Sequence, residues 1–331
     1  MEARRFCSAL AFFLCLSLAL PALHAAPPSG SAVLTFGSFS EREGALFVAE
    51  DQGFFRKYGL DVKLVHVRSG PIGLSALSAG ESQFYNGSAT GAILGAAAGG
   101  LDLVFVAGLI NKLTGAFVVN PAIKPPADLK GRNIGVQSMG GGIWMFTMLV
   151  FDYWGLDLKR DNINFRIIGD EAVLAQALAN RVIDGSYMGY TFASILERQG
   201  FRVLADCAKL GIPYQGTGIM ARRSYISAAP DTTERLLRAL VDAIKFIQEP
   251  ANQAQATKSL AKGLRLSRVE EAAEGYGRMI SMYDRKIYPN LEGVRNAVRL
   301  LGTVNEKIGR LKVEDLVDDS FVKKLEREGR F

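Results

Sequence analysis

The chain has 331 residues, of which 49% are hydrophobic and 22% charged, and its formal net charge is +6. A chain of this length and apolar content has room for two domains, each with a hydrophobic core of its own. Its lysines and arginines form no basic tract, so the composition gives no indication of a nucleic-acid partner.

The N-terminus has the pattern of a secretory signal peptide. Arg4 and Arg5 precede an apolar run, Cys7–Leu20, and small residues suited to cleavage follow it. We therefore predict that residues 1–26 are removed and that the mature protein is exported to the periplasm. Cleavage leaves Cys207 as the only cysteine, which excludes an internal disulfide in the mature monomer and predicts a buried, inert thiol.

Strands and helices alternate through the first two thirds of the chain, which predicts α/β units with largely parallel sheets covered on both faces. In a first unit we predict strands at 33–37, 61–67, 82–86 and 103–109, and helices at 45–57, at 71–79 and after a turn at 87–91. In a second unit we predict strands at 115–120, 133–137, 164–168, 184–188 and 201–205, and helices at 143–153, 171–180 and 191–199. The segment 216–221 leads out of this unit, and the sequence from Arg222 onward is predicted to be helical.

A glycine-rich turn, Ser138–Gly142, is the first candidate for a ligand site, because it follows a predicted strand and precedes an apolar helix. Backbone N–H groups at a helix N-terminus have no intrahelical acceptor, and the helix dipole favours an oxyanion there. The turn matches neither common phosphate motif: Gly141 stands where a P-loop needs lysine, and Met145 breaks the dinucleotide fingerprint. A tight turn without a ligand remains the alternative.

Four passages, in their order and spacing, resemble a known family: AEDQGFFRKYGLDVKLV (49–65), LSALSAGESQF (74–84), PADLKGRNIGV (126–136) and AQALANRVIDGSYM (175–188). In them the chain is similar to the periplasmic substrate-binding proteins of ABC importers, in the nitrate/sulfonate/taurine group that also includes pyrimidine-precursor binders. The resemblance implies a type II clamshell, with two Rossmann-like lobes joined by two crossing strands and a helical C-terminal segment. It implies lobe one at residues 31–114 plus 217–331 and lobe two at residues 115–216.

Ligands of open α/β sheets bind at the carboxyl ends of the strands, and in a clamshell these ends face the cleft between the lobes. Loops there supply hydroxyls, backbone amides and aromatic walls, with Trp144 and Tyr190 as further aromatic candidates and Trp144 more simply placed in the core. The candidate ligand-binding residues are Ser38, Phe39, Ser40, Gly87, Ser88, Ala89, Thr90, Ser138, Met139, Gly140, Gly141, Gly142, Tyr187 and Met188.

Charged residues near these loops have two interpretations. Arg42 is flanked by Glu41 and Glu43, so a solvated charge run is favoured over a role in binding an anion. Asp170 and Glu171 most simply cap the helix that follows them. A carboxyl group that faced the cleft would instead suit an amine on the ligand.

The chain is predicted to bind a solute rather than transform it. The mature sequence has one histidine, His66, in a β-like run, and it contains no zinc, triad or nucleophile motif. The yeast-type pyrimidine synthases belong to the same fold group, but their CCCFC motif is absent here. We therefore expect no catalytic residue, metal or cofactor, and a monomer that delivers a small polar or anionic organic solute to an ABC permease. A pyrimidine-precursor binder and a ligand-sensing lobe of a membrane receptor remain alternatives.

Overall fold

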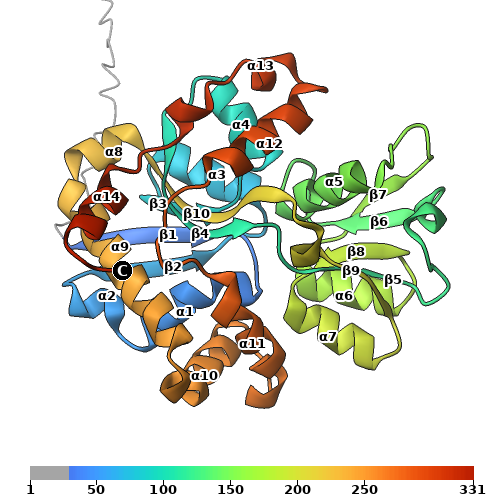
Figure 1. Ribbon diagram of the computed structural model, residues 1–331, viewed down its shortest axis with the longest axis horizontal. Helices are drawn as coiled ribbons and strands as arrows, with labels where there is room; N and C mark the ends of the chain where they lie inside the picture. The colour runs from blue at the N-terminus through green and yellow to red at the C-terminus, as the bar shows by residue number, and fades with distance from the viewer. Residues whose placement is uncertain (1–29) are drawn as a thin grey trace, which may run out of the picture.

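The computed structural model describes residues 30–331, which form two five-stranded sheets flanked by helices (Figure 1). The predicted signal peptide at residues 1–26 lies outside the described residues. The first sheet has the order β2-β1-β3-β10-β4. Its strands are β1 (Ser31–Phe36), β2 (Asp61–His66), β3 (Phe84–Gly87), β4 (Leu103–Lys112) and β10 (Pro213–Arg222).

The second sheet repeats this topology, with the order β7-β6-β8-β5-β9. Its strands are β5 (Ala116–Val119), β6 (Asn133–Val136), β7 (Asn164–Ile167), β8 (Gly185–Met188) and β9 (Arg202–Asp206). In each sheet three strands pair in parallel, while β10 and β5 run antiparallel to both of their neighbours. The sheets are therefore mixed, each with one reversed strand in a largely parallel arrangement.

Two chain crossings join the sheets side by side. Strand β4 leads through residues 113–115 directly into β5, and β9 returns through the 3-10 helix η3 (Cys207–Leu210) to β10. Because β4 and β10 are neighbours in the first sheet, both crossings lie next to each other.

Seven helices cover the two sheets within the α/β part of the chain. The predicted helix at 45–57 is divided in two, because Gly53 adopts a left-handed conformation with φ of +77°. The helices on the first sheet are α1 (Gly44–Asp51), α2 (Phe54–Lys57), α3 (Gly70–Ala79) and α4 (Gly91–Ala98). On the second they are α5 (Gly142–Trp154), α6 (Glu171–Ala179) and α7 (Tyr190–Arg198).

The chain after β10 is helical, as predicted, and most of it packs around the first sheet (Figure 1). Helix α9 buries Leu236, Leu240 and Ile244 at helical spacing. The C-terminal helices are α8 (Arg223–Ala228), α9 (Pro230–Gln248), α10 (Gln253–Gly263), α11 (Ala273–Met282), α12 (Leu291–Gly302), α13 (Glu306–Gly309) and α14 (Ser320–Arg327).

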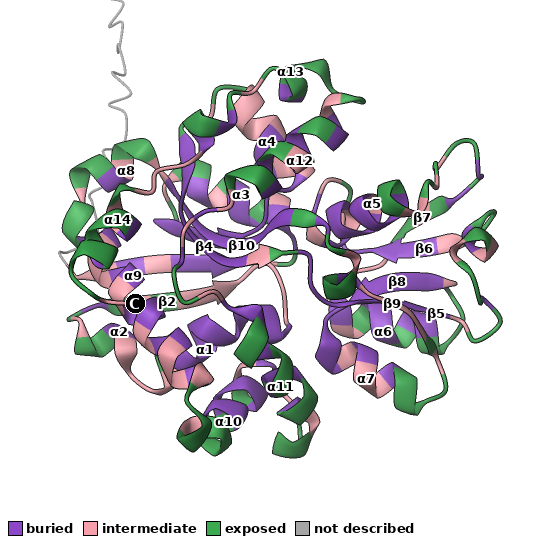
Figure 2. Cartoon of the chain, viewed as in Figure 1, coloured by how far each residue is buried: buried purple, intermediate pink, exposed green. Residues whose placement is uncertain are grey.

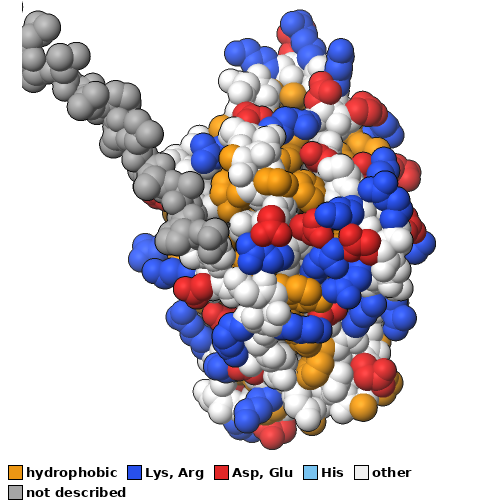
Figure 3. Space-filling model, turned by 90° about the vertical axis from the view of Figure 1, so that its left-hand side faces the viewer, with side chains coloured by type: hydrophobic (Ala, Val, Ile, Leu, Met, Phe, Trp, Pro, Cys, Tyr) orange, Lys and Arg blue, Asp and Glu red, His pale blue; other side chains and the backbone are white. Residues whose placement is uncertain are grey.

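The central strands of both sheets are buried, whereas the edge strands β2, β7 and β9 are half-buried or exposed, and the helices expose their outer faces (Figure 2). Figure 3 shows that the face on the side of the first sheet carries Lys and Arg side chains interspersed with Asp and Glu, with no large area of one sign. Between residues 30 and 331 no helix is both long and apolar enough to cross a membrane.

Candidate ligand-binding site

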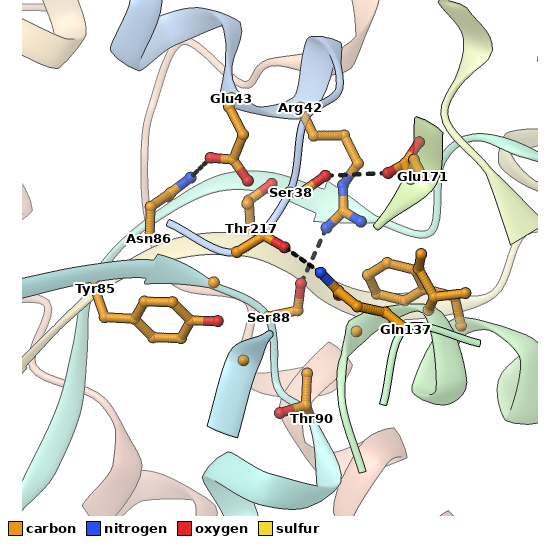
Figure 4. Close-up of a pocket in the computed structure, with 16 residues that line it drawn as sticks. Ser38, Arg42, Glu43, Tyr85, Asn86, Ser88, Thr90, Gln137, Glu171 and Thr217 are labelled. Atoms are coloured by element: carbon orange, nitrogen blue, oxygen red, sulfur yellow. Dashed lines mark hydrogen bonds between the residues drawn. The ribbon is translucent and has the colours of Figure 1, made fainter. Parts of the chain in front are cut away.

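A pocket lies between the two sheets, and both sides of the molecule contribute to its lining (Figure 4). Loops at the carboxyl ends of β1 and β3 face the end of β6 and the first turns of α5 and α6. The cavity itself is about 40 Å³, and the wider space around it, with the open solvent at its mouth, is about 490 Å³. The lining residues are Gly37, Ser38, Arg42, Glu43, Gly70, Tyr85, Asn86, Gly87, Ser88, Thr90, Gln137, Gly142, Ile143, Phe146, Glu171 and Thr217.

Arg42 supplies a buried positive charge to this pocket. It lies in the 3-10 helix η1 (Glu41–Glu43) after β1, and its residue is only 5% exposed. Its Nη2 atom donates to Ser88 Oγ at 3.0 Å and to the carbonyl oxygen of Gly216, and its guanidinium lies 4.3 Å from the centre of the Phe146 ring. The prediction that residues 41–43 form a solvated charge run is therefore wrong.

No carboxylate within the described residues forms an ion pair with Arg42, and its Nε atom is buried without a hydrogen-bond partner there. A guanidinium taken out of water is costly unless an anion and hydrogen bonds compensate it. Arg42 is therefore a buried positive charge without an ion-pair partner in the described part of the chain.

The position of Arg42 is fixed from the C-terminal helical region. The hydroxyl of Tyr283 donates to the carbonyl oxygens of Glu41 and Arg42, at 2.9 and 3.0 Å, and accepts from Ala45 N at 2.9 Å. These bonds hold the short turn η1 against the end of α11, although the two segments are some 240 residues apart in sequence.

Two buried carboxyl groups also face the pocket. Glu43 accepts a hydrogen bond from Asn86 Nδ2, and burial raises the pKa of Glu43 to about 8 although Arg42 and Asn86 oppose the shift. Glu171 accepts from Ser38 Oγ at 3.0 Å and from Gly189 N at 2.8 Å. Burial, followed by the negative charge of Glu41, raises the pKa of Glu171 to about 7. Near neutral pH the net charge of the pocket therefore stays positive.

Tyr85 is held in a slot that only glycines leave open. A Cβ atom on Gly87 would lie 2.5 Å from Tyr85 Cε1, and one on Gly73 would lie 2.7 Å from Cε2. On Gly37 and Gly70 it would lie 3.3 and 3.2 Å from the hydroxyl oxygen. The ring is buried, and its hydroxyl points toward the pocket (Figure 4).

The two sides of the pocket touch directly. Gln137 Nε2 donates to the carbonyl oxygens of Gly37 and Arg68, at 2.9 and 2.7 Å. Farther along the same boundary, the Glu41 carboxylate accepts from Tyr190 N at 2.7 Å, and from Thr191 N and Oγ1 at 3.2 and 2.9 Å. These contacts close the space between the sheets.

Of the predicted ligand-binding residues, Ser38, Gly87, Ser88, Thr90 and Gly142 line the pocket. Gly142 begins α5, so its amide belongs to the first helical turn, where N–H groups lack intrahelical acceptors. The remainder lie outside the lining: Phe39, Ser40, Ala89, Ser138, Met139, Gly140, Gly141, Tyr187 and Met188.

The glycine-rich turn contributes less to the pocket than its sequence indicated. The carbonyl oxygen of Gly140 accepts from Ala92 N at 2.9 Å, so the turn packs against the start of α4. Met139 is 51% exposed, and Ser138 Oγ is buried without a partner in the described part of the chain. The turn therefore forms a contact between the two sides, and only its last residue, Gly142, reaches the pocket.

The aromatic candidates also lie away from the central pocket. Phe39 packs on His66 with ring centres 3.9 Å apart, beside a separate hollow lined by residues of α1 and α10. Tyr187 is fully buried against Phe146, and Tyr190 donates to Asp206 Oδ1 at 2.6 Å.

Other single-residue predictions are met. Trp144 is half-buried and packs against the core, which confirms the prediction that it is a core residue rather than a wall of the ligand site. Asp170 caps α6 by accepting from Val173 N at 3.2 Å, whereas its neighbour Glu171 lines the pocket. Cys207 is fully buried, and burial raises the pKa of its thiol.

Sequence reasoning did not select several lining residues, namely Glu43, Tyr85, Asn86, Gln137, Phe146 and Thr217. Two of these had a usable signal, because Asn86 and Gln137 stand at the carboxyl ends of predicted strands. Among residues 30–331, no group of three or more His, Cys, Asp and Glu residues is placed to hold a metal ion.

Comparison with solved structures identifies the fold. The alkanesulfonate-binding protein SsuA of Xanthomonas axonopodis matches with a TM-score of 0.73 and 21% identity, over 89% of this chain and 99% of that one. The periplasmic nitrate-binding protein NrtA of Synechocystis matches with a TM-score of 0.74 and 14% identity, over 92% and 90%. The desulfurization enzyme DszB shares the fold with a TM-score of 0.61 and 19% identity, over 90% and 99%. These likenesses confirm the predicted periplasmic-binding-protein fold.

Sequence comparison agrees with the fold. A Brucella abortus protein named "Putative binding protein" is 25% identical over 270 residues, which cover 79% of this chain and 81% of the relative. The model of the family described as NMT1/THI5 like matches residues 43–254, which include most of the pocket lining. The chain therefore belongs to the NMT1/THI5-like family.

Proposed function

We propose that the mature protein is a periplasmic solute-binding protein that captures a small anionic organic solute, such as a sulfonate or carboxylate, and delivers it to an ABC permease. The observation that carries this proposal is the buried guanidinium of Arg42, which faces the pocket without an ion pair in the described chain. A ligand anion would supply the missing negative charge.

Hydroxyl groups around Arg42 suit the same anion. Ser38, Ser88 and Thr90 line the pocket together with Arg42, and Gly142 adds the first turn of α5. Hydroxyls and backbone amides can each donate to an oxyanion, and a helix N-terminus adds about 0.3–1 kcal/mol. Hydrogen bonds to a charged group contribute about 1.5–3 kcal/mol each. Several of them with Arg42 would reach the roughly 8 kcal/mol that micromolar binding requires.

The composition of the pocket favours binding over catalysis. Its lining contains neither histidine nor cysteine: His66 lies beside the separate hollow next to Phe39, and Cys207 is buried in the second sheet's core. DszB shows that the fold can carry an enzyme, so the proposal rests on the residues of the pocket and not on the fold. We propose a monomeric binder without catalytic residues, metal or cofactor.

We further propose that ligand release requires the two sides to separate. The lobes would be residues 31–114 with 217–331 and residues 115–216, and the two adjacent crossings would act as the hinge. The bonds from Gln137 to Gly37 and Arg68 support this, because they seal a pocket that a ligand must enter. Such closure about a hinge is the known behaviour of periplasmic binding proteins.

The test is calorimetric titration of the mature protein with ethanesulfonate, propanoate, nitrate and sulfate, combined with small-angle scattering. At least one anion should bind and reduce the radius of gyration. Arg42→Gln should weaken that binding at least tenfold, since a hydrogen-bonded charge contributes about 1.5–3 kcal/mol. The control is Arg295→Gln, which removes an exposed arginine paired with Glu314 at 2.9 Å. Absence of any anion binding, or equal affinity in Arg42→Gln, would overturn the proposal.

A further inference from the structure

A second cavity lies on the first-sheet side of the molecule, apart from the central pocket. It is the separate hollow beside Phe39, and its lining comes from β1, β2, α1 and α10 and from the turns that follow β1 and α10. None of these lining residues lines the central pocket. Its volume of about 210 Å³ exceeds that of the central cavity, and an apolar cavity of about 150 Å³ can hold a benzene ring. The hollow therefore has room for a ligand with one aromatic ring.

Aromatic side chains form one wall of the hollow. The rings of Phe39 and His66 lie 3.9 Å apart, centre to centre, with an angle of 36° between their planes. Phe36 packs edge-on against Phe39 at 6.1 Å and against Phe47 at 5.6 Å. Phe39 and His66 are only half-buried, so part of their surface faces the open space. A further ring, placed in an offset or edge-on contact, would extend this cluster favourably.

Arg265 places a positive charge beside the same wall. Its guanidinium carbon lies 5.1 Å from the centre of the Phe39 ring, and no carboxylate in the described chain forms an ion pair with it. The other cation of the hollow, Lys262, is already paired with Asp51 at 2.6 Å. Arg265 is thus the cation that a ligand anion can use here. Glu50 also lines the hollow and would disfavour a second acid group on the ligand.

The backbone at Arg265 would suit glycine better than arginine. Helix α10 ends in a Schellman motif, in which Leu266 N donates to the carbonyl oxygen of Ala261 at 2.9 Å. In the same motif Arg265 N donates to the carbonyl oxygen of Lys262 at 3.1 Å. Arg265 therefore has a φ of +56°, at the position that glycine fills most often. Strained positions of this kind are frequent at ligand sites, and the contact with Phe39 gives the arginine side chain a reason to be here.

We propose that the separate hollow is a second ligand site, which takes an aromatic monocarboxylate with its ring on the Phe39–His66 pair and its carboxylate at Arg265. The site is independent of the central pocket and of the function proposed for that pocket. An aliphatic acid would use Arg265 but not the aromatic wall, so the wall determines the ligand class.

Benzoate is the probe for this site, and NMR of His66 reports on its binding. The chain from residue 27 onward contains no other histidine, so the imidazole signals have a single source. Benzoate should shift these signals, and it should bind about threefold or more tightly than cyclohexanecarboxylate, as expected from a contact between rings. The shift should persist in Arg42→Gln, which alters the central pocket and leaves the hollow unchanged.

Arg265→Gly should weaken benzoate binding about tenfold, because it removes the charged partner of the carboxylate. It should also raise the urea midpoint, since glycine adopts a φ of +56° without strain, so weaker binding would not reflect poorer folding. The matched control is Arg181→Gly, at the corresponding position after α6, where φ is +59° and the side chain is exposed outside the hollow. This variant should raise the midpoint and keep the benzoate affinity. Unshifted His66 signals in millimolar benzoate, a shift that is lost in Arg42→Gln, or equal affinity in Arg265→Gly would overturn the inference.

Discussion

The contact of Glu41 with α7 should determine how firmly the two sides of the molecule stay closed. Glu41 is fully buried, and its carboxylate accepts from Tyr190 N, Thr191 N and Thr191 Oγ1 at 2.7–3.2 Å. These donors belong to the first turn of α7, where the helix dipole further favours a negative charge. Since Glu41 lies on the first-sheet side and α7 on the second, separation of the two sides would break all three bonds.

Glu41→Gln keeps the size of the side chain but replaces one acceptor oxygen with an NH₂ group that faces the donors of α7. Loss of one charge-assisted hydrogen bond costs about 1.5–3 kcal/mol, and loss of the charge at the helix N-terminus costs about 0.3–1 kcal/mol. We therefore expect the closed form to lose about 2–4 kcal/mol relative to the open form. If only the closed form holds the ligand firmly, the apparent affinity should fall about 30- to 1000-fold.

The assay is calorimetric titration with the anion that the wild-type protein binds, together with small-angle scattering with and without it. Glu41→Gln should bind weakly and show less compaction, while the unfolding midpoint without ligand should change little, because water solvates this carboxylate in the open form. The control is Asp161→Asn: Asp161 accepts from Asp157 N at 2.8 Å and pairs with Lys130 within the second-sheet side, so its loss should lower stability without changing closure. Wild-type affinity in Glu41→Gln would refute the reasoning.

Stability should depend on pH through the two pocket carboxyls. Burial raises the pKa of Glu43 to about 8 and that of Glu171 to about 7, so between about pH 5 and 8 the folded state binds more protons than the unfolded state. The free energy of unfolding should therefore decline as pH rises, by up to about 1.4 kcal/mol per pH unit for each group. Urea titrations should show a smaller decline in Glu43→Gln, and an unchanged slope would contradict this. Gly293→Ala should destabilise the protein by about 1–3 kcal/mol, because its Cβ would lie 2.3 Å from the carbonyl carbon of Tyr214. Gly277→Ala in α11 meets nothing within 4 Å and should instead stabilise by up to about 1 kcal/mol, as measured by the urea midpoint.

The order of strands and helices could be predicted because each has a local signal. Alternating apolar residues predict β2, and a continuous apolar run predicts β4. In α9 the apolar residues recur at helical spacing. Strand direction has no such signal. Whether β5 runs parallel or antiparallel depends on the crossing that delivers it from β4 into the other sheet, and this crossing is set by the packing of the whole molecule.

The candidate site was predicted by position more successfully than by residue type. Ser38, Ser88 and Thr90 follow strand ends and line the pocket, as the rule for open α/β sheets requires. The same rule predicted a ligand site at Ser138–Gly142. In the structure the carbonyl oxygen of Gly140 in this turn instead accepts a hydrogen bond from Ala92 N. Local sequence cannot reveal that contact, since α4 lies some 50 residues earlier in the chain.

The charged triplet at residues 41–43 shows why a pattern of alternating charge can be misjudged. In a 3-10 turn three consecutive side chains point in different directions, so Arg42 does not pair with either of its neighbours. Glu41 is engaged by the amides of α7, and Glu43 is engaged by Asn86. Each carboxylate is thus bonded to a partner distant in sequence. The buried guanidinium between them has no ion-pair partner among the described residues, although, against the effect of burial, the nearby charges of Glu43 and Glu171 help to raise its pKa. Alternating charge in a short stretch of sequence therefore does not imply that the neighbouring side chains pair with one another or with water.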